Sequence, residues 1–165
     1  MATSSIKIIK VGPRHTRIVS RIIEKSWLWH YRTFIPLRAM LPFAGKKHFL
    51  ATREMILSPR ALTFLALEGN NPVAVMVMIR RPWGIEVEEL FILPGYTGKG
   101  IGTALFHIAR SYTVENNFRL RIGAMTGNKR ARRFYEQHGR RLLKRYRYGW
   151  GVRTFPSVLY EWPRS

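Results

Sequence analysis

The apolar positions in the first half of the chain follow two periods, and each period predicts a different element. Residues 6–11 alternate between apolar side chains and lysine, as a half-buried strand does, whereas apolar residues of 18–27 recur at helical spacing. The segment 27–43 is aromatic but contains two prolines, which favour a loop over a cleft rather than a strand. The pattern therefore predicts a strand over 6–11, a helix around 18–27, a loop over 27–43, a helix over 47–57, and a hairpin of buried strands over 61–67 and 73–79.

The second half of the chain is organised around a strand, a glycine loop and a helix. Residues 86–93 are extended in character, Pro94 and Gly95 end that strand, and three alternating glycines open a segment of helical period. After that helix we expect a strand over 118–124, a helix from Asn128 to Gly139, and two strands over 142–150 and 157–162 with a loop around Arg153 and Pro156. The sum predicts an α/β fold, with a mixed and mostly antiparallel sheet flanked by helices, in a single domain over residues 1–165.

Gly98, Gly100 and Gly102 stand where that strand has ended and the helix begins. A side chain at any of these positions would keep a ligand's phosphates away from backbone N–H groups that no helical carbonyl satisfies. Those free donors and the positive end of the helix dipole together form an anion site. The spacing excludes two phosphate-binding loops. A Walker loop needs Ser or Thr directly after Lys99, and the dinucleotide fingerprint needs two residues between its last two glycines.

Gly100 and Gly102 instead match the pyrophosphate loop of the GNAT superfamily of N-acetyltransferases, whose pattern is Arg or Gln, two residues, Gly, any residue, then Gly or Ala. Further along the chain, a second segment resembles that family's pattern N-x-x-A-x-x-F-Y-E-x-x-G through Asn128, Ala131, Phe134, Tyr135, Glu136 and Gly139. The resemblance is close over residues 61–140 and covers the N-terminal part in outline. Thr97 departs from the pattern, because the family usually has Arg or Gln there, and this departure removes one side-chain contact to the pyrophosphate.

The resemblance implies a GNAT domain that uses acetyl-CoA as co-substrate. The residues implied to bind it are Phe91, Ile92 and Leu93 through their backbones, the loop residues Gly98, Lys99, Gly100, Ile101, Gly102 and Thr103, and Asn128, which also caps its helix. Tyr135 would protonate the leaving thiolate, because a thiol of pKa about 8.5 is a fair leaving group beside a phenol of pKa about 10. The alternative is that Tyr135 is only a core aromatic residue beside Phe134.

Three of the nine acidic residues, Glu86, Glu88 and Glu89, cluster on the strand before the loop. Strand alternation places Glu86 and Glu88 on one face and Glu89 on the other, unless a bulge shifts the register. An amine acceptor needs a base, because an amine of pKa about 10.4 is neutral to only a few parts in ten thousand at pH 7. Either Glu86 or Glu88 is a candidate to take that proton, directly or through water. The alternative is a group of ion pairs on one strand of a basic protein.

The chain carries 29 basic and 9 acidic residues, a net charge of +20, and the excess is densest after Phe118. Such a charge suits either a well-solvated surface or a polyanionic partner, such as nucleic acid. Tyr146 and Tyr148 alternate with basic residues, in a pattern typical of stacking platforms for single-stranded nucleic acid. The arginines that could follow its phosphates, or meet those of the coenzyme, are Arg130, Arg132, Arg133, Arg140, Arg141, Arg145 and Arg147.

Composition narrows the function further. The chain has no cysteine and five scattered histidines, so we expect no disulfide, no metal site and no cysteine nucleophile. The longest apolar run, 73–79, is shorter than the roughly 20 residues of a membrane helix, so we expect a soluble cytoplasmic protein. The aromatic residues that belong either to the core or to an acceptor pocket include Trp27, Trp29, Tyr31, Phe34 and Phe43.

Two classes of function follow from these patterns. The first is an acetyl-CoA-dependent N-acetyltransferase in which the amine attacks the thioester directly, since no cysteine is present to carry the acetyl group. Its acceptor stays open among protein amino groups, aminoacyl-tRNA, small amines and antibiotics, with polyamines disfavoured by charge repulsion. The second is a basic nucleic-acid-binding protein on the same fold with little or no turnover. Neither class fixes an oligomeric state.

Overall fold

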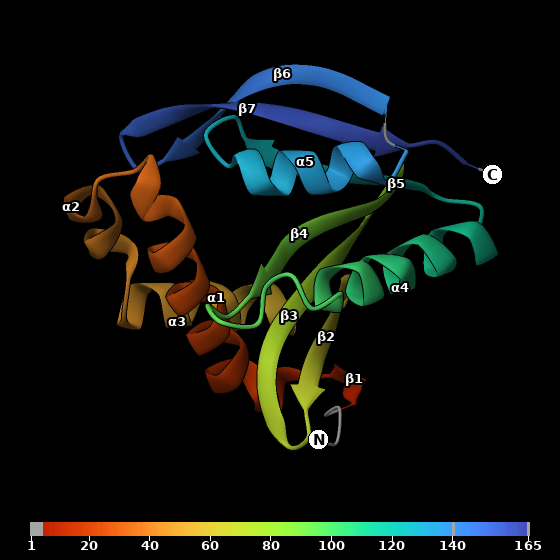
Figure 1. The fold of residues 1–165 in the computed structure, drawn as a ribbon, viewed down its shortest axis with the longest axis horizontal. Helices are drawn as coiled ribbons and strands as arrows, with labels where there is room; N and C mark the ends of the chain where they lie inside the picture. The colour runs from red at the N-terminus through yellow and green to blue at the C-terminus, as the bar shows by residue number, and fades with distance from the viewer. Residues whose placement is uncertain (1–4, 140, 165) are drawn as a thin grey trace.

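The protein is built on one twisted sheet, seen from the side in Figure 1. The structure, a computed structural model, describes residues 5–139 and 141–164. The strand order is β1-β2-β3-β4-β5-β7-β6, and within the described chain β4 and β5 are the one parallel pair. The strands are β1 Ile6–Val11, β2 Ala61–Glu68, β3 Asn71–Arg81, β4 Gly84–Ile92, β5 Arg119–Met125, β6 Arg141–Trp150 and β7 Arg153–Trp162. The predicted mixed, mostly antiparallel sheet is confirmed.

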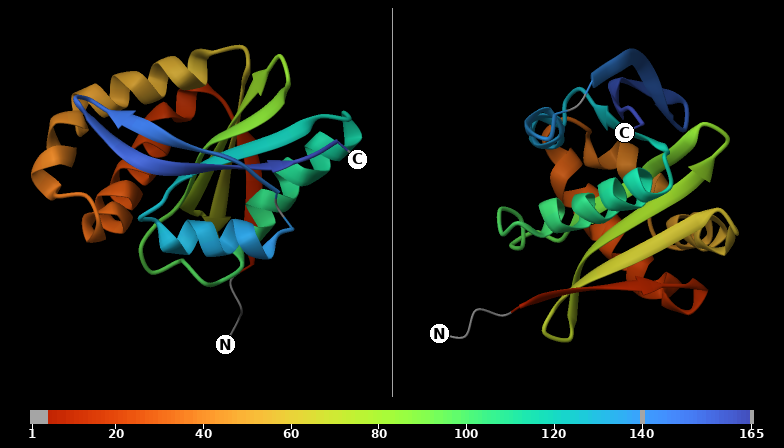
Figure 2. Two further views of the ribbon diagram at one scale, coloured as in Figure 1. Left: turned by 90° about the horizontal axis from the view of Figure 1, so that it is seen from above. Right: turned by 90° about the vertical axis from the view of Figure 1, so that its right-hand side faces the viewer.

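Helices cover both faces of the sheet (Figure 2). α4 and α5 pack against one face, and α1 and α3 pack against the other. The longer helices are α1 Thr16–His30, α3 Lys46–Leu57, α4 Ile101–Glu115 and α5 Lys129–Gln137, and the short ones are η1 Pro13–His15, η2 Tyr31–Thr33, α2 Leu37–Met40 and η3 Leu41–Phe43. None of the described helices has the length and apolar character needed to cross a membrane.

The predicted loop over 27–43 is wrong, because most of this segment is helical. α1 continues to His30, and η2, α2 and η3 follow it. Pro36 is the N-cap residue of α2, and Pro42 lies in the first turn of η3. At the start of a helix the backbone N–H makes no intrahelical hydrogen bond, so a proline there costs nothing. The two prolines therefore divide the segment into short helices and do not exclude helical structure.

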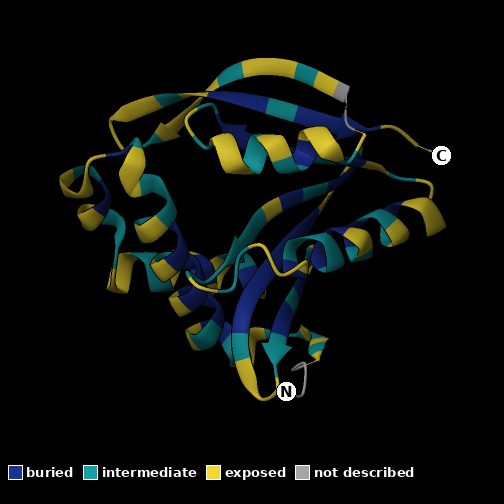
Figure 3. Ribbon diagram, in the orientation of Figure 1, coloured by how far each residue is buried: buried dark blue, intermediate teal, exposed yellow. Residues whose placement is uncertain are grey.

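β3 is buried on both faces, which explains its uninterrupted apolar sequence (Figure 3). Met76 and Met78 point toward the side of α4 and α5, whereas Val75 and Val77 point toward the side of α1 and α3. A strand covered on both sides has no polar face, so its sequence does not alternate. The predicted hairpin of β2 and β3 is confirmed.

The predicted loop around Arg153 and Pro156 is also wrong. β7 already begins at Arg153, and Pro156 pairs with Arg147 of β6. On its other side β7 pairs with β5 only from Ser157 onward. A proline is therefore tolerated at position 156, since only one neighbouring strand lies beside it there.

Candidate active site

β4 and β5 separate part-way along their length, and this separation creates the candidate site. The two strands pair from Gly84 to Val87 of β4, but β4 continues to Ile92 and β5 continues past the end of the pairing to Met125. A pocket of about 370 Å³ opens there, lined by residues 86–91 of β4 and 122–125 of β5. The remaining walls come from α1, η2, η3, α3, α5, β6 and β7.

The backbone edge of β4 is open on the side where β5 has left it. The N–H of Leu93 donates to the carbonyl of Val73 in β3 at 2.9 Å. Because successive backbone groups of a strand point in opposite directions, those of Ile92 and Leu90 face away from β3. The carbonyl of Ile92 already accepts a hydrogen bond from Nε2 of His30 at 3.1 Å. The backbone that can pair with an extended ligand is therefore chiefly that of Leu90, together with the N–H of Ile92.

The glycine loop and the start of α4 form a cradle of free backbone donors. Gly98 and Gly100 have φ angles of 82° and 78°, which residues with side chains rarely adopt. The first helical hydrogen bond runs from the N–H of Ala104 to the carbonyl of Gly100. No acceptor among the described residues pairs with the N–H groups of residues 98–103. This arrangement fits an anionic group such as a pyrophosphate.

Gly102 has a different role from the other two loop glycines. A Cβ at this position would lie 3.2 Å from Cδ1 of Ile92 and 3.7 Å from the ring of Phe134. Gly102 therefore allows α4 to approach β4 and α5 closely. Lys99, in the same loop, forms an ion pair with Glu68, since its Nζ lies 3.6 Å from a carboxylate oxygen of that residue.

Arg130 of α5 brings a positive charge to the loop. Its Nη2 lies 3.9 Å from the point where a Cβ of Gly98 would stand. The side chain is exposed and can reach an anion held by the loop. Thr97 lacks the charge or amide that the family pattern has at its position, so Arg130 supplies a cation to the same loop from a different element.

α5 begins as predicted and carries Tyr135 into the pocket. Oδ1 of Asn128 accepts a hydrogen bond from the N–H of Ala131 at 3.1 Å, so the predicted cap is confirmed. Tyr135 is 5% exposed, and its ring packs against those of Phe106 and Tyr160. Burial, followed by the proximity of Tyr160, raises the pKa of Tyr135. The phenol is therefore protonated at neutral pH and able to donate.

The strand glutamates are rearranged by a β-bulge. Val77 of β3 pairs with Glu89 and Met78 pairs with Val87, so Glu88 is an extra residue without a partner. The simple alternation expected for these glutamates therefore breaks, and Glu86, Glu88 and Glu89 all line the same pocket.

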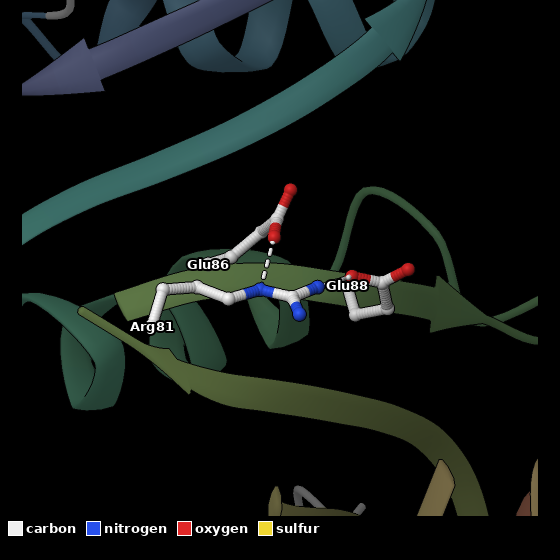
Figure 4. Close-up of polar contacts among 3 residues, drawn as sticks. All are labelled: Arg81, Glu86 and Glu88. Atoms are coloured by element: carbon white, nitrogen blue, oxygen red, sulfur yellow. Dashed lines mark hydrogen bonds and ion pairs between the residues drawn. The ribbon is translucent and has the colours of Figure 1, made fainter. Parts of the chain in front are cut away.

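Arg81 holds two of these carboxylates (Figure 4). Its Nε donates to Oε2 of Glu86 at 2.6 Å, and its Nη2 donates to Oε2 of Glu88 at 3.1 Å. Burial and the neighbouring Glu86 raise the pKa of Glu88, while Arg81 opposes that rise. Glu86 and Glu88 thus share one guanidinium, which balances only one of their two negative charges.

Glu89 is the strand glutamate that Arg81 does not hold. Across the described residues its carboxylate makes no ion pair. Burial, with a smaller contribution from Glu88, raises the pKa of Glu89 to about 8. Glu89 also lies close to two phenols, since burial and then Glu89 raise the pKa of Tyr31 and bring that of Tyr148 to about 12. A carboxyl group with this pKa can take a proton from an ammonium group near neutral pH.

β6 presents aromatic and basic residues on opposite faces. Tyr146, Tyr148 and Trp150 line the pocket, whereas Arg145 and Arg147 alternate with them and point away. The hydroxyl of Tyr146 lies so close to Gly123 of β5 that a side chain there would collide with it. The aromatic residues therefore do not form a stacking platform beside the arginines. Arg140 and the side chain of Arg141 lie outside the described part of the chain.

Three of the five N-terminal aromatic candidates line the pocket. Trp27, Tyr31 and Phe43 do so, and their rings lie 5.1, 5.9 and 5.9 Å from that of Trp150. Trp29 is exposed with Arg32 stacked on it, and Phe34 packs against Tyr31. The pocket lining also includes the predicted residues Glu86, Glu88, Phe91, Asn128 and Tyr135, whereas Ile92, Leu93 and the loop residues 98–103 lie outside it.

Metal ligands are not grouped in the described chain. No three His, Asp or Glu side chains within it come together in a way that could hold a metal ion.

Comparisons with known proteins place this arrangement in a family. The sequence model of the acetyltransferase (GNAT) family matches residues 25–139. The chain belongs to the GNAT acetyltransferase family. An uncharacterized N-acetyltransferase of Mycobacterium tuberculosis is 30% identical over 104 residues, which are 62% of each chain. The alignment thus spans less than two thirds of that relative's length.

Solved structures share the fold of this GNAT chain at low identity. The PaiA N-acetyltransferase of Thermoplasma acidophilum, in complex with coenzyme A, superimposes with a TM-score of 0.80 at 18% identity, covering 98% of this chain and 99% of that one. The ribosomal-protein-S18-alanine N-acetyltransferase of Escherichia coli superimposes with a TM-score of 0.71 at 16% identity, covering 98% and 95%. The predicted GNAT resemblance and its fold are confirmed.

Proposed function

We propose that this GNAT protein is an acetyl-CoA-dependent N-acetyltransferase in which the acceptor amine attacks the thioester directly. The observation that carries the proposal is the meeting of Glu89 and Tyr135 in one pocket, where β4 and β5 separate. One group is a carboxyl with a pKa of about 8, and the other is a protonated phenol. The first suits a general base and the second a general acid. We assign residues 1–165 to this one acetyltransferase domain.

The remaining residues fit acetyl-CoA, which would supply an activated acetyl group. The free N–H groups of residues 98–103 would hold its pyrophosphate, with Arg130 as the neighbouring cation. The open backbone edge at Leu90 and Ile92 would pair with its pantetheine arm, next to Phe91 and Leu93. Asn128 fixes the start of α5 and so places both Arg130 and Tyr135.

The pocket residues can perform both proton transfers of the reaction. Glu89 takes a proton from the acceptor ammonium, which frees the nitrogen lone pair to form the new C–N bond. The C–S bond breaks, and Tyr135 gives its proton to the departing sulfur. The acetylated nitrogen then loses its second proton to the Tyr135 phenolate, directly or through water, which leaves a neutral amide and restores the phenol. Since the chain has no cysteine, an acetyl group carried on a protein thiol is excluded.

Glu86 and Glu88 are assigned a supporting role in this proposal. Both were candidates for the base, but the Arg81 guanidinium occupies one oxygen of each. A carboxylate bound by arginine is a weaker proton acceptor, because the ion pair favours its charged form. We therefore assign the base to Glu89, and the positioning of β4 around the bulge to the Arg81 pairs.

Titration calorimetry with acetyl-CoA tests the proposal. Wild-type protein should bind, and Gly100→Val should bind at least about tenfold more weakly, because a β-branched residue is strained at the φ of 78° and covers the cradle. Gly45→Val is the matched control, since Gly45 has a similar φ of 64° with open space around it. Label from acetyl-CoA should then appear on amines of a cell lysate. Absence of binding at millimolar acetyl-CoA would overturn the proposal.

A further inference from the structure

The half of the pocket away from the glycine loop has an aromatic wall and one unpaired carboxylate. Tyr31 and Tyr148 both lie near Glu89, and Tyr31 also contacts the ring of Trp150 at 5.9 Å. Building on the proposed function, we propose that the acceptor is a small arylalkylamine: one primary amine, a short carbon chain and one aromatic ring. The ammonium lies at Glu89, and the ring packs against Tyr31, Tyr148 and Trp150.

The charges in this half of the pocket match a single ammonium group. Glu86 and Glu88 share the single positive charge of Arg81, which leaves one negative charge on that pair, and ionised Glu89 adds a second. Burial lowers the pKa of His48, whose ring is therefore neutral, and Lys47 stands over the ring of Phe43 at 4.4 Å. Lys47 offsets one of the two negative charges, so the net charge of the described pocket lining matches one ammonium group, and a second ammonium of a polyamine would be repelled by Lys47.

The shape of the pocket favours a small acceptor over a peptide. Two segments beside the pocket, η3 and the turn between β6 and β7, touch each other. The rings of Phe43 and Trp150 are 5.9 Å apart, and a side chain at Gly151 would collide with Phe43. A peptide chain would need an open groove between these segments, because its amides must run out to solvent. Trp27, another lining residue, packs on Trp150 with ring centroids 5.1 Å apart.

A panel of amines tests this class. The release of coenzyme A can be followed with a thiol reagent without background, since the protein has no cysteine. The amines are 2-phenylethylamine, n-butylamine, spermidine and a tripeptide with a free N-terminus. We expect kcat/KM for 2-phenylethylamine to exceed that of each other amine by roughly 10- to 100-fold, the range for burying one aromatic ring. Equal or faster turnover of any of the other three would overturn the inference.

Variants of the aromatic wall provide a second test. Tyr148→Ala should lower the preference for 2-phenylethylamine over n-butylamine at least about fivefold, and Tyr148 is 47% exposed, so its removal leaves the fold intact. Trp150→Ala should do the same, with circular dichroism as a check on folding. Tyr112→Ala, on the far side of the sheet, is the control and should leave the preference unchanged. A preference that survives both pocket variants would contradict the inference.

Failure of this inference can be told apart from failure of the proposed function. Titration calorimetry of 2-phenylethylamine into protein saturated with coenzyme A measures acceptor binding without turnover. Binding that Tyr148→Ala weakens, without any acetyl transfer, would support the acceptor class and contradict the acetyltransferase. Acetyl transfer to other amines without binding of 2-phenylethylamine would support the acetyltransferase and contradict the acceptor class.

Discussion

The proposed coenzyme side and the proposed acceptor side of the candidate site are built in different ways. The coenzyme side consists of two short continuous segments, the strand, loop and helix start over 86–105 and the start of α5 after Asn128. The acceptor side is assembled from α1, η3, α3 and β6, which are far apart in the sequence. Backbone donors and glycine conformations dominate the first, and aromatic side chains dominate the second. In the proposed function, coenzyme recognition therefore depends on local sequence, whereas acceptor recognition depends on how distant elements pack.

The largest loss of activity should follow replacement of Glu89, the proposed base. Glu89→Gln should lower kcat by roughly 100- to 10,000-fold, the usual contribution of a general base. In the wild type, kcat/KM should rise with pH up to about 8, as the raised pKa of Glu89 requires it to lose its proton before it acts as a base. The variant should lose that step. Stopped assays between pH 6 and 10 measure both effects.

Glu115→Gln on the exposed end of α4 is the control for this substitution and should behave as the wild type. If Glu86→Gln or Glu88→Gln abolished the pH step and Glu89→Gln kept it, the base would be one of the two glutamates bound to Arg81.

Tyr135 should produce the next largest effect. Tyr135→Phe should lower kcat by roughly 10- to 1000-fold, because the leaving sulfur loses its proton donor, while acetyl-CoA binding changes little. Tyr112→Phe, which removes a hydroxyl that accepts from Arg80, is the matched control. Steady-state kinetics and calorimetry together separate the two quantities. Full activity of Tyr135→Phe would leave Tyr135 with a packing role alone.

Arg130 should affect only the coenzyme side. Arg130→Gln should weaken acetyl-CoA binding by roughly tenfold through loss of one charge-assisted contact, and acceptor KM should stay the same. Arg133→Gln, another exposed arginine of α5, should have little effect. Thr97→Arg should leave affinity unchanged or improve it. Equal losses in Arg130→Gln and Arg133→Gln would point to the general positive charge and not to a contact at Gly98.

Replacement of Gly123 should change only the kinetics of the acceptor amine, and this change should be the smallest of those predicted here. Gly123→Ala should push the hydroxyl of Tyr146 aside and lower kcat/KM for the amine roughly two- to tenfold, with acetyl-CoA affinity unchanged. In the double variant with Tyr146→Phe the colliding oxygen is absent. That variant should recover part of the loss if displacement of Tyr146 is the cause, and a double variant worse than Gly123→Ala would contradict it.

The same contrast explains how much could be predicted from the sequence. The strand, the glycine loop and the cap at Asn128 are local features, so the pattern predicted them, and the GNAT resemblance implied the position of Tyr135. The role of Glu89 depends on the bulge at Glu88, which arises from pairing with β3. No local pattern specifies that pairing, and simple alternation pointed to Glu86 and Glu88 instead.

The aromatic residues of β6 show a second reason why an expectation from the sequence differed from the structure. Their alternation with arginines is visible in the sequence, but alternation does not say which face of the hairpin meets the rest of the protein. The packing of Trp150 on Trp27 turns the aromatic face inward and the arginines outward. A pattern that resembled a nucleic-acid platform thus became one wall of the pocket.

The buried carboxyl of Glu89 also has a consequence for the stability of the protein. A group whose pKa rises on folding, here to about 8 from the usual range of a glutamate, stabilises the native state most when it is protonated in both the folded and the unfolded state. That contribution is complete below about pH 4.5 and is lost as pH rises through 8. Glu89→Gln should therefore melt at a higher temperature than wild type at pH 9 and at nearly the same temperature at pH 4. The residue proposed as the catalytic base therefore also lowers the stability of the folded protein at alkaline pH.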